Sequence, residues 1–418
     1  MLQAALASGA AHRRSVFELF ARRIPGGRRY GVVAGTGRFL DALEDFRFDA
    51  ETIDHLRSHH VVDEPTLDFL ASYRFGGDVW GYAEGDLWFP HSPVLVVEAS
   101  FAEAVLLETI ALSILNHDSA IATAASRMTA AANDRGCIEM GSRRTHEQAA
   151  VAAARAASIA GFTATSNLEA GRRYGVPTTG TSAHAFTLLH DSESDAFRAQ
   201  VDSLGRGTTL LVDTYDVAEA VRLAVETAGP ELGAVRIDSG DLGELAHQVR
   251  AQLDSLGATD TRILVTSDLD EFAIAALKAA PVDGYGVGTQ LVTGSGHPTC
   301  GFVYKLVAHL DDAGTWIDVA KHSPDKSSVG GRKYASRRFA GDTAVAEVIR
   351  IGDPGAAPAI PDDERDLLVP LVREGEVIGQ ESLDRARERH RNARATLPLR
   401  GRRLSKGDPA LVVEMTTL

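Results

Sequence analysis

The stretch from residue 137 to residue 310 constrains the fold most, because it repeats one pattern several times. Short apolar segments end in small or polar residues, and a sequence typical of a helix follows each of them. The segments lie at 162–168, 209–216, 233–241, 261–270 and 282–289. Strands that alternate with helices predict a parallel sheet, because each parallel connection needs a crossover. The number of units favours an irregular parallel α/β barrel, and an open doubly wound sheet is the alternative.

The sequences on both sides of this stretch do not repeat its pattern of strand and helix. Residues 15–98 alternate short apolar runs with Gly and Pro, as strands and turns do. Residues 101–132 place Leu106, Ile110 and Ile114 at helical spacing with no Pro or Gly between them, which predicts one long connecting helix. The tail mixes strands with a basic helix. We therefore predict an α+β outer domain formed by both chain ends, with segments 1–132 (outer domain and helix), 133–329 (barrel) and 330–418 (its completion).

Charge and composition exclude several classes of protein. The formal net charge is −14, so the chain as a whole repels nucleic acid, and we interpret the arginines at 385–403 as a solvated helix face. The two cysteines, Cys137 and Cys300, lack metal-ligand spacing. No apolar run reaches the ~18 residues of a membrane helix, and no cleavage-like signal opens the chain. We expect a cytoplasmic protein without a membrane or nucleic-acid partner.

Polar residues at the ends of apolar strands are the first candidates for a site, because parallel barrels gather their active sites there. The segment VRIDSGD, at 235–241, crowds two acids and a serine at such an end. Asp238 suits the two hydroxyls of a ribose, and Arg236 can fork onto a carboxylate or a phosphate. Asp241 can hold Mg²⁺ through water. The alternative is that Asp241 or Ser239 only caps the next helix.

Two further segments carry small and hydroxylated residues. In YGVGTQL, at 285–291, a glycine pair precedes Thr289 at an expected helix start. Backbone amides there can cradle a phosphate, and an ordinary turn is the alternative. In GVPTTGTSAHAF, at 175–186, His184 follows Thr181 in a setting of Gly, Thr and Ser. A lone histidine is usually structural, yet imidazole is a nucleophile near neutral pH, as a phosphoryl relay requires.

The last candidate is EMGSRRTHEQAA, at 139–150, where Arg143 and Arg144 stand side by side before helical text. Paired guanidinium groups in a turn can clamp a pyrophosphate or a carboxylate. A salt-bridged pair on the surface is the alternative.

Five of these segments together resemble a known family. GSRRTH, GTSAHAF, VRIDSGDL, GYGVGTQLVT and GFVYKLV resemble, in this order, the signature segments of nicotinate phosphoribosyltransferases. The match also includes FELFARRIP, the text through Glu98 and KHSPDKSSVGGRK from Lys321, so it covers nearly the whole chain. The resemblance implies a type II phosphoribosyltransferase fold, an irregular α/β barrel with an outer domain built from both chain ends. It also implies a homodimer with shared sites.

The resemblance implies the reaction as well. Nicotinate, 5-phosphoribosyl-1-pyrophosphate (PRPP), ATP and water would give nicotinate mononucleotide, diphosphate, ADP and phosphate with Mg²⁺, as the first step of NAD synthesis from nicotinate. His184 would be transiently phosphorylated by ATP, and Thr181 and Arg236 would contact nicotinate. A bidentate guanidinium at Arg236 would favour the carboxylate of nicotinate over the neutral amide of nicotinamide. By motif position, the reaction centre would include Asp238, and PRPP would bind Thr289, Gly288, Ser267 and Arg143.

The sequence departs from the family pattern at its start. Family members normally begin close to TDxYxLTM, whose tyrosine stacks on the pyridine ring, whereas Met1 here falls within that first helix. We expect the natural start to lie upstream. Two alternatives stay open: a phosphoribosyltransferase acting on nicotinamide or quinolinate, and a catalytically silent relative that binds PRPP or nicotinate. Quinolinate has two carboxylates and would need a denser basic pocket than these arginines indicate.

Overall fold

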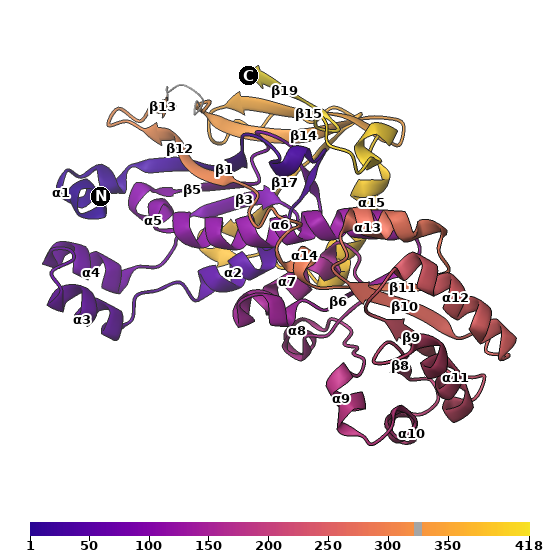
Figure 1. Ribbon diagram of the computed structural model, residues 1–418. Helices are drawn as coiled ribbons and strands as arrows, with labels where there is room; N and C mark the ends of the chain where they lie inside the picture. Colours follow the sequence, from indigo (N-terminus) through magenta and orange to yellow (C-terminus); the bar gives the residue numbers. More distant parts are fainter. Residues whose placement is uncertain (322–327) are drawn as a thin grey trace. The chain divides into compact units, whose positions relative to one another are not determined.

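The computed structural model describes residues 1–321 and 328–418, and the chain divides into two compact units. The first unit joins Met1–Ala120 to Thr299–Leu418, and the second is Ile121–Pro298. Figure 1 shows the elements of each unit along the chain. Both chain ends contribute to the first unit, as the resemblance implied. Part of the KHSPDKSSVGGRK segment lies outside the described residues.

The division of the chain differs from the boundaries predicted after residues 132 and 329. The strand β12 (Phe302–Leu310) was expected in the barrel. It pairs antiparallel with β1 (Arg14–Ala21) instead, and its residue Lys305 lies opposite Glu18. The barrel-forming part of the sequence therefore ends at Pro298, because β12, the next strand, belongs to the sheet of the first unit.

A seven-stranded antiparallel sheet forms the centre of the first unit. All residues of β1 except the first are buried, so both faces of this strand are covered. The strand order is β13-β12-β1-β5-β3-β17-β18. The remaining strands of this sheet are β3 (Asp78–Tyr82), β5 (Leu95–Ser100), β13 (Trp316–Asp318), β17 (Leu368–Arg373) and β18 (Glu376–Val377).

A second, four-stranded sheet in this unit carries buried charges. Its order is β16-β14-β15-β19, with bounds Glu364–Asp366, Arg332–Ala340, Thr343–Gly352 and Val412–Thr417. Arg332 of β14 donates to Glu98 of β5 at 2.8 Å, and Lys333 lies 2.8 Å from Glu18. These four side chains are at most 8% exposed. Buried ion pairs thus join the two sheets, since an unpaired charge would be costly there.

Short helices complete the first unit. They are α1 (Leu2–Ala7), α2 (Thr36–Glu44), α3 (Ala50–Ser58), α4 (Glu64–Ser72), α5 (Phe101–Leu106) and α15 (Leu383–Ala395), and β2 (Gly31–Val32) pairs with β4 (Leu87–Trp88). Ser100 and Glu103 form a capping box at the start of α5. The single helix predicted over 101–132 is interrupted at Leu107, and α6 (Glu108–Ala132) continues into the second unit.

The second unit is built on a six-stranded parallel sheet. Its order is β7-β6-β11-β10-β9-β8, with strands β6 (Gly136–Glu139), β7 (Ala164–Thr165), β8 (Thr209–Leu211), β9 (Ala234–Ile237), β10 (Arg262–Ser267) and β11 (Gly284–Val287). Among the described strands, the edges β7 and β8 do not pair with each other, so the sheet forms an incompletely closed half-barrel. Each of the five predicted segments contains one of these strands, whereas β6 was not predicted.

Polar residues at the carboxyl ends of these strands start the helices that follow. The side chains of Asp216, Asp241 and Asp270 accept backbone hydrogen bonds at the starts of α11 (Val217–Ala228), α12 (Leu242–Ser255) and α13 (Glu271–Ala276). Such capping stabilises a helix end by about 1 kcal/mol. The other helices are α7 (Glu147–Ile159), α8 (Leu168–Tyr174), α9 (His184–Leu189), α10 (Glu193–Leu204) and α14 (Thr289–Val292). In the described part of the chain, every helix is too short or too polar to cross a bilayer.

Candidate active site

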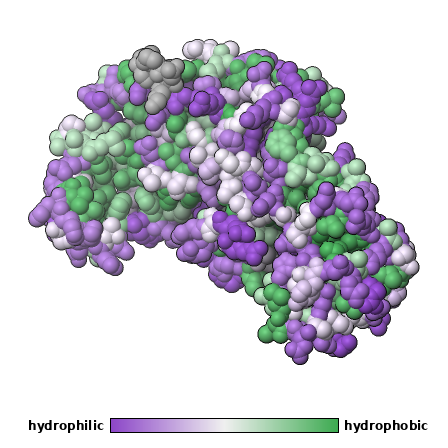
Figure 2. All heavy atoms as spheres, in the orientation of Figure 1, coloured by the Kyte–Doolittle hydropathy of each residue, from purple (hydrophilic) through white to green (hydrophobic). Residues whose placement is uncertain are grey.

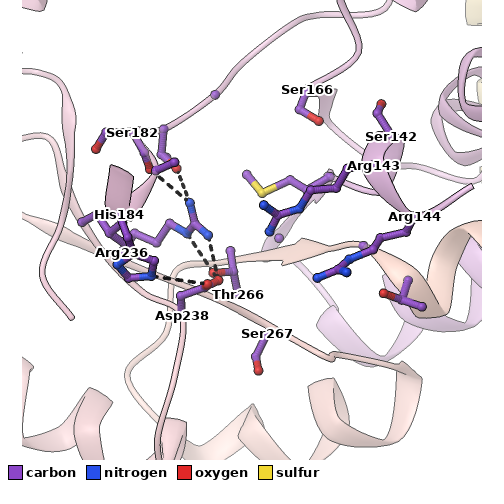
Figure 3. A pocket seen from close by; sticks show the side chains of 18 of the residues that line it. Ser142, Arg143, Arg144, Ser166, Ser182, His184, Arg236, Asp238, Thr266 and Ser267 are labelled. Atoms are coloured by element: carbon purple, nitrogen blue, oxygen red, sulfur yellow. Dashed lines mark hydrogen bonds and ion pairs between the residues drawn. The ribbon is translucent and has the colours of Figure 1, made fainter. Parts of the chain in front are cut away.

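A cavity of about 500 Å³ opens at the carboxyl ends of the parallel strands in the second unit. The structure brings most of the predicted site residues to it, namely Arg143, Thr181, His184, Arg236, Asp238, Ser267, Gly288 and Thr289. They come from loops and elements far apart in the sequence. Figure 3 shows Arg236, Asp238 and Thr266 at its centre, with Arg143 and Arg144 across the cavity from them.

Arg236 is held in one orientation by its neighbours. Its Nε donates to the hydroxyl of Thr266 at 2.8 Å, and one terminal nitrogen donates to Thr181 Oγ1 at 2.6 Å. The other terminal nitrogen lies 2.7 Å from Asp238 Oδ1, and the side chain is 12% exposed. The guanidinium is thus fixed at the end of β9 before any ligand arrives, which lowers the entropic cost of binding.

Asp238 completes a closed network with these groups. The hydroxyl of Thr266 donates to Asp238 Oδ1, which also accepts from Arg236. Burial alone would raise the pKa of Asp238, but the bonds from Thr266 and Arg236 outweigh it and hold the pKa below its usual value. The carboxyl group is therefore ionised at neutral pH. Its side chain stays 26% exposed, so it can accept hydrogen bonds from a ligand.

His184 opens the short helix α9 and lies beside two carboxylates. Its Nε2 is 3.8 Å from Asp238 Oδ2 and 3.9 Å from Asp213 Oδ1, and its Nδ1 is 3.2 Å from the hydroxyl of Thr214. The imidazole is 41% exposed, so it remains open to a ligand. The two carboxylates near Nε2 and the hydroxyl near Nδ1 together define the orientation of the ring.

Asp213 is a site residue that the sequence interpretation missed. Its side chain is 2% exposed, and Oδ2 accepts from the backbone of Asp238 at 2.9 Å and from Ser239 at 2.6 Å. The other oxygen, Oδ1, is buried without a hydrogen bond among the described residues and faces His184. The sequence did contain a signal for Asp213, because this acid ends the apolar segment TLLVD as Asp238 ends VRID. The prediction named the segment as a strand but assigned no site residue in it.

Strained backbone and glycine line the far wall of the cavity. Ser267, the last residue of β10, has a φ of 144°, which favours glycine. A Cβ at Gly286 would clash with Thr266 and Met140, so only glycine fits between these strands. Gly288 and Thr289 follow at the start of α14. Backbone that is held this closely to a cavity can present its amides to an anion.

Arg143 and Arg144 bring unpaired positive charge to the cavity. Both lie in the turn Ser142–Arg144 and are exposed. Within residues 1–321 and 328–418, neither forms an ion pair, which argues against the salt-bridged surface pair. Behind them, buried Glu139 accepts from Gly141 and Thr165 and anchors the turn. The two guanidinium groups are therefore available to a phosphate or a carboxylate.

Asp241 is not among the described residues that line the cavity. Its carboxylate accepts from the backbone of Glu244 at 3.1 Å and caps α12, which is the alternative weighed for it. The sequence could not separate these roles because a capping aspartate and a metal-binding aspartate both follow a strand. Asp268, which was not predicted, lines the cavity instead.

Comparisons with known proteins agree with the motifs. The family model described as the nicotinate phosphoribosyltransferase N-terminal domain matches residues 1–116, and the model of the nicotinate phosphoribosyltransferase family matches residues 136–345. The chain is 57% identical to nicotinate phosphoribosyltransferase pncB1 of Mycobacterium tuberculosis over 98% of this chain and 92% of that protein. It is 38% identical to nicotinate phosphoribosyltransferase of Bacillus subtilis, covering 79% of this chain and 69% of that protein.

A solved structure supports the fold. The crystal structure of human nicotinic acid phosphoribosyltransferase superposes with a TM-score of 0.83 at 24% identity, covering 99% of this chain and 96% of that one. At this level of identity the likeness shows the architecture alone. The family is shown by the two family models, which match most of the chain, and by the relative that is 57% identical. The chain belongs to the nicotinate phosphoribosyltransferase family.

Proposed function

We propose that this enzyme transfers the phosphoribosyl group of PRPP to nicotinate, giving nicotinate mononucleotide and diphosphate. The observation that carries the proposal is the fixed Arg236–Asp238 pair at the end of β9, across the cavity from the unpaired Arg143 and Arg144. The pair offers a cation for a ring carboxylate beside an anion for ribose hydroxyls. The opposite wall offers cations for the pyrophosphate, so the ring carboxylate, the ribose and the pyrophosphate each have a partner of suitable charge.

The proposed chemistry requires charge stabilisation more than proton transfer. Breaking the bond between the ribose carbon and pyrophosphate leaves positive charge on the sugar and negative charge on the leaving group. Ionised Asp238 opposes the first, and Arg143 and Arg144 oppose the second. Asp238 and Asp268 are the cavity carboxylates that would hold Mg²⁺, in place of Asp241, and the ion would supply further positive charge to the leaving pyrophosphate.

We further propose that ATP phosphorylates His184, as the resemblance implied. Asp213 and Asp238 lie near Nε2 and favour the tautomer that carries its proton there, so the lone pair lies on Nδ1. Once the Thr214 hydroxyl, 3.2 Å away, turns from Nδ1, this lone pair attacks the γ-phosphorus while ADP departs. Hydrolysis of the phosphohistidine then gives phosphate. The phosphoryl group adds charge beside the PRPP site, which would order the loops around it. If His184→Ala protein still hydrolyses ATP in step with product formation, this coupling role is wrong.

The assembly and setting of the enzyme belong to the same proposal. We propose a cytoplasmic homodimer that catalyses the first step of NAD synthesis from nicotinate. In support of a protein contact near the site, Leu188 and Leu189 of α9 are 61% and 79% exposed, and Figure 2 shows hydrophobic atoms at the surface where Figure 1 draws α9. Light scattering of Leu188→Ser/Leu189→Ser protein tests this contact: we expect a lower mass than for the unmodified protein.

Product analysis tests the activity directly. Nicotinate, nicotinamide and quinolinate are each supplied with PRPP and Mg²⁺, with and without ATP. We expect nicotinate mononucleotide as the main product, with ADP and phosphate formed when ATP is present. Faster turnover of quinolinate or nicotinamide would overturn the assignment of the base. No turnover of any base, with PRPP still bound, would show a silent relative.

A further inference from the structure

A second cavity, of about 430 Å³, lies entirely within the first unit and has no role in the proposed reaction. It is formed by strands β1, β3, β5, β13, β14 and β17 and by the loop around Pro354. Two kinds of side chain dominate its described lining. The aromatic rings are Trp80, Trp316 and Tyr334, and the guanidinium groups are Arg14, Arg332 and Arg373.

The inner part of this cavity is rigid and buried. The guanidinium carbon of Arg332 lies 5.0 Å from the ring centre of Trp80 and 4.5 Å from that of Tyr334. Arg332 is 4% exposed and pairs with Glu98, which is 8% exposed. The hydroxyl of Tyr334 donates to the backbone of Asp353 at 2.8 Å. The two rings are thus fixed by stacking on a neutralised cation, and each keeps part of its surface accessible.

The rim of the cavity carries positive charge that is only partly neutralised. The guanidinium of Arg373 lies 4.8 Å from the ring of Trp80, and its contact with Asp78 is 3.9 Å long. Asp78 also accepts from the backbone of Glu374 at 2.8 Å. Arg14 is exposed and forms no ion pair among the described residues. Three guanidinium groups therefore face two carboxylates, which is unusual in a chain of net charge −14.

A ligand that uses this whole cavity needs a flat ring and an anionic group in one molecule. An inorganic anion would leave the ring of Trp316 and the accessible part of Tyr334 uncovered. An uncharged aromatic compound would leave Arg14 without an anion and Arg373 with only its 3.9 Å contact to Asp78. We propose that this cavity binds a nucleoside phosphate, whose base stacks on the aromatic rings and whose phosphates contact Arg14 and Arg373. The volume is within the range of small-molecule sites.

Intrinsic fluorescence gives a readout confined to the first unit. Trp80 and Trp316 line the cavity, and the third tryptophan of the chain, Trp88, is fully buried elsewhere in the same unit. The described lining of the catalytic cavity contains no tryptophan. The full-length protein is titrated with ADP, with adenosine and with inorganic pyrophosphate, all without Mg²⁺. We expect saturable quenching by ADP, and dissociation constants for the other two probes that are at least roughly tenfold higher.

Two variants and a matched control locate the site. Arg14→Gln and Trp316→Leu should each raise the dissociation constant for ADP roughly tenfold, because the first removes one of the two phosphate contacts and the second removes one of the stacking rings. Arg13→Gln removes the same charge from the neighbouring residue, which pairs with Asp312 and does not line the cavity. It should leave the constant unchanged. The proposal is overturned if ADP does not quench saturably, if pyrophosphate binds as tightly as ADP, or if Arg13→Gln weakens binding as much as Arg14→Gln.

Discussion

The first unit and the catalytic cavity both pair an arginine with a carboxylate, but they do so at different depths. Arg337 in β14 is 1% exposed and contacts Asp86 at 2.7 Å and Glu347 at 2.8 Å, which are at most 1% exposed. Arg236 also contacts its partner Asp238 at 2.7 Å, yet Asp238 is 26% exposed. The buried network joins strands and has no room for a ligand. The open network leaves polar groups accessible. The same kind of ion pair therefore stabilises the fold in one region and, in the proposed function, binds substrate in the other.

The largest effect should follow from breaking the buried network. Arg337→Met leaves Asp86 and Glu347 without their shared cation, and we expect a loss of about 3–5 kcal/mol in the free energy of unfolding. Equilibrium denaturation in urea measures it. Arg365→Met is the matched control, because Arg365 also contacts Asp86 at 2.8 Å but is 46% exposed. Similar losses in the free energy of unfolding for the two variants would contradict the claim that the buried ion pairs matter more for stability than the exposed one.

Breaking the open network should affect catalysis and leave stability nearly unchanged. Arg236→Lys keeps the charge but loses the guanidinium group that can bind a carboxylate through two hydrogen bonds. We expect kcat/KM for nicotinate to fall on the order of 100-fold. Discrimination against nicotinamide should fall as well. Steady-state kinetics with both bases, beside urea denaturation, measure the two effects. A variant that unfolds more easily yet keeps its kcat/KM would assign Arg236 a structural role.

A pH series sharpens the contrast between the regions. Burial, with Arg394 adding to it, lowers the pKa of His390 in α15 to about 3. The folded state thus requires the neutral ring, so this contribution to stability is full above pH 6.5, the usual pKa, and declines as pH falls toward about 3. At pH 5 the loss should be about 2 kcal/mol relative to pH 7.5. In His390→Gln protein this part of the decline should vanish, and an unchanged slope would show that His390 does not cause it.

The smallest effect should come from the hydroxyl that links Arg236 to Asp238. Thr266→Val keeps the shape of a residue that is 4% exposed but removes this link. We expect roughly a tenfold rise in KM for nicotinate, since one hydrogen bond to charged groups is lost. Thr266→Ser restores the hydroxyl and should recover most of the affinity. If the serine variant is as impaired as the valine variant, packing and not the hydroxyl is what matters.

The sequence predicted the parts of the site that a single segment contains. Arg236 and Asp238 follow an apolar strand, so their position at a strand end could be expected. The link through Thr266 could not, because it depends on the pairing of β9 with β10, where Leu264 lies opposite Arg236. Strand β6 was missed because its four residues, GCIE, contain only two apolar side chains. Sheet order and register, which bring distant segments together, are properties of the folded chain.

Strand β12 and Asp241 show two further limits. An apolar strand after the barrel text has the composition of a barrel strand, and only its pairing with β1 places it in the first unit. An aspartate after a strand suits a cap and a metal site equally, so the choice depends on where its carboxylate points. In contrast, His184 and Thr289 lie in motifs of several small residues, and the structure brings both to the cavity.

In the proposed reaction, the cavity at the carboxyl ends of the parallel strands holds a carboxylated ring beside a phosphorylated ribose. A crystal structure of the protein with nicotinate and PRPP tests it most directly. We predict that the carboxylate of nicotinate contacts the guanidinium of Arg236 and that ribose hydroxyls contact Asp238. Density for either ligand outside this cavity, with Arg236 still bonded only to Thr181, Ser182, Thr266 and Asp238, would contradict this prediction.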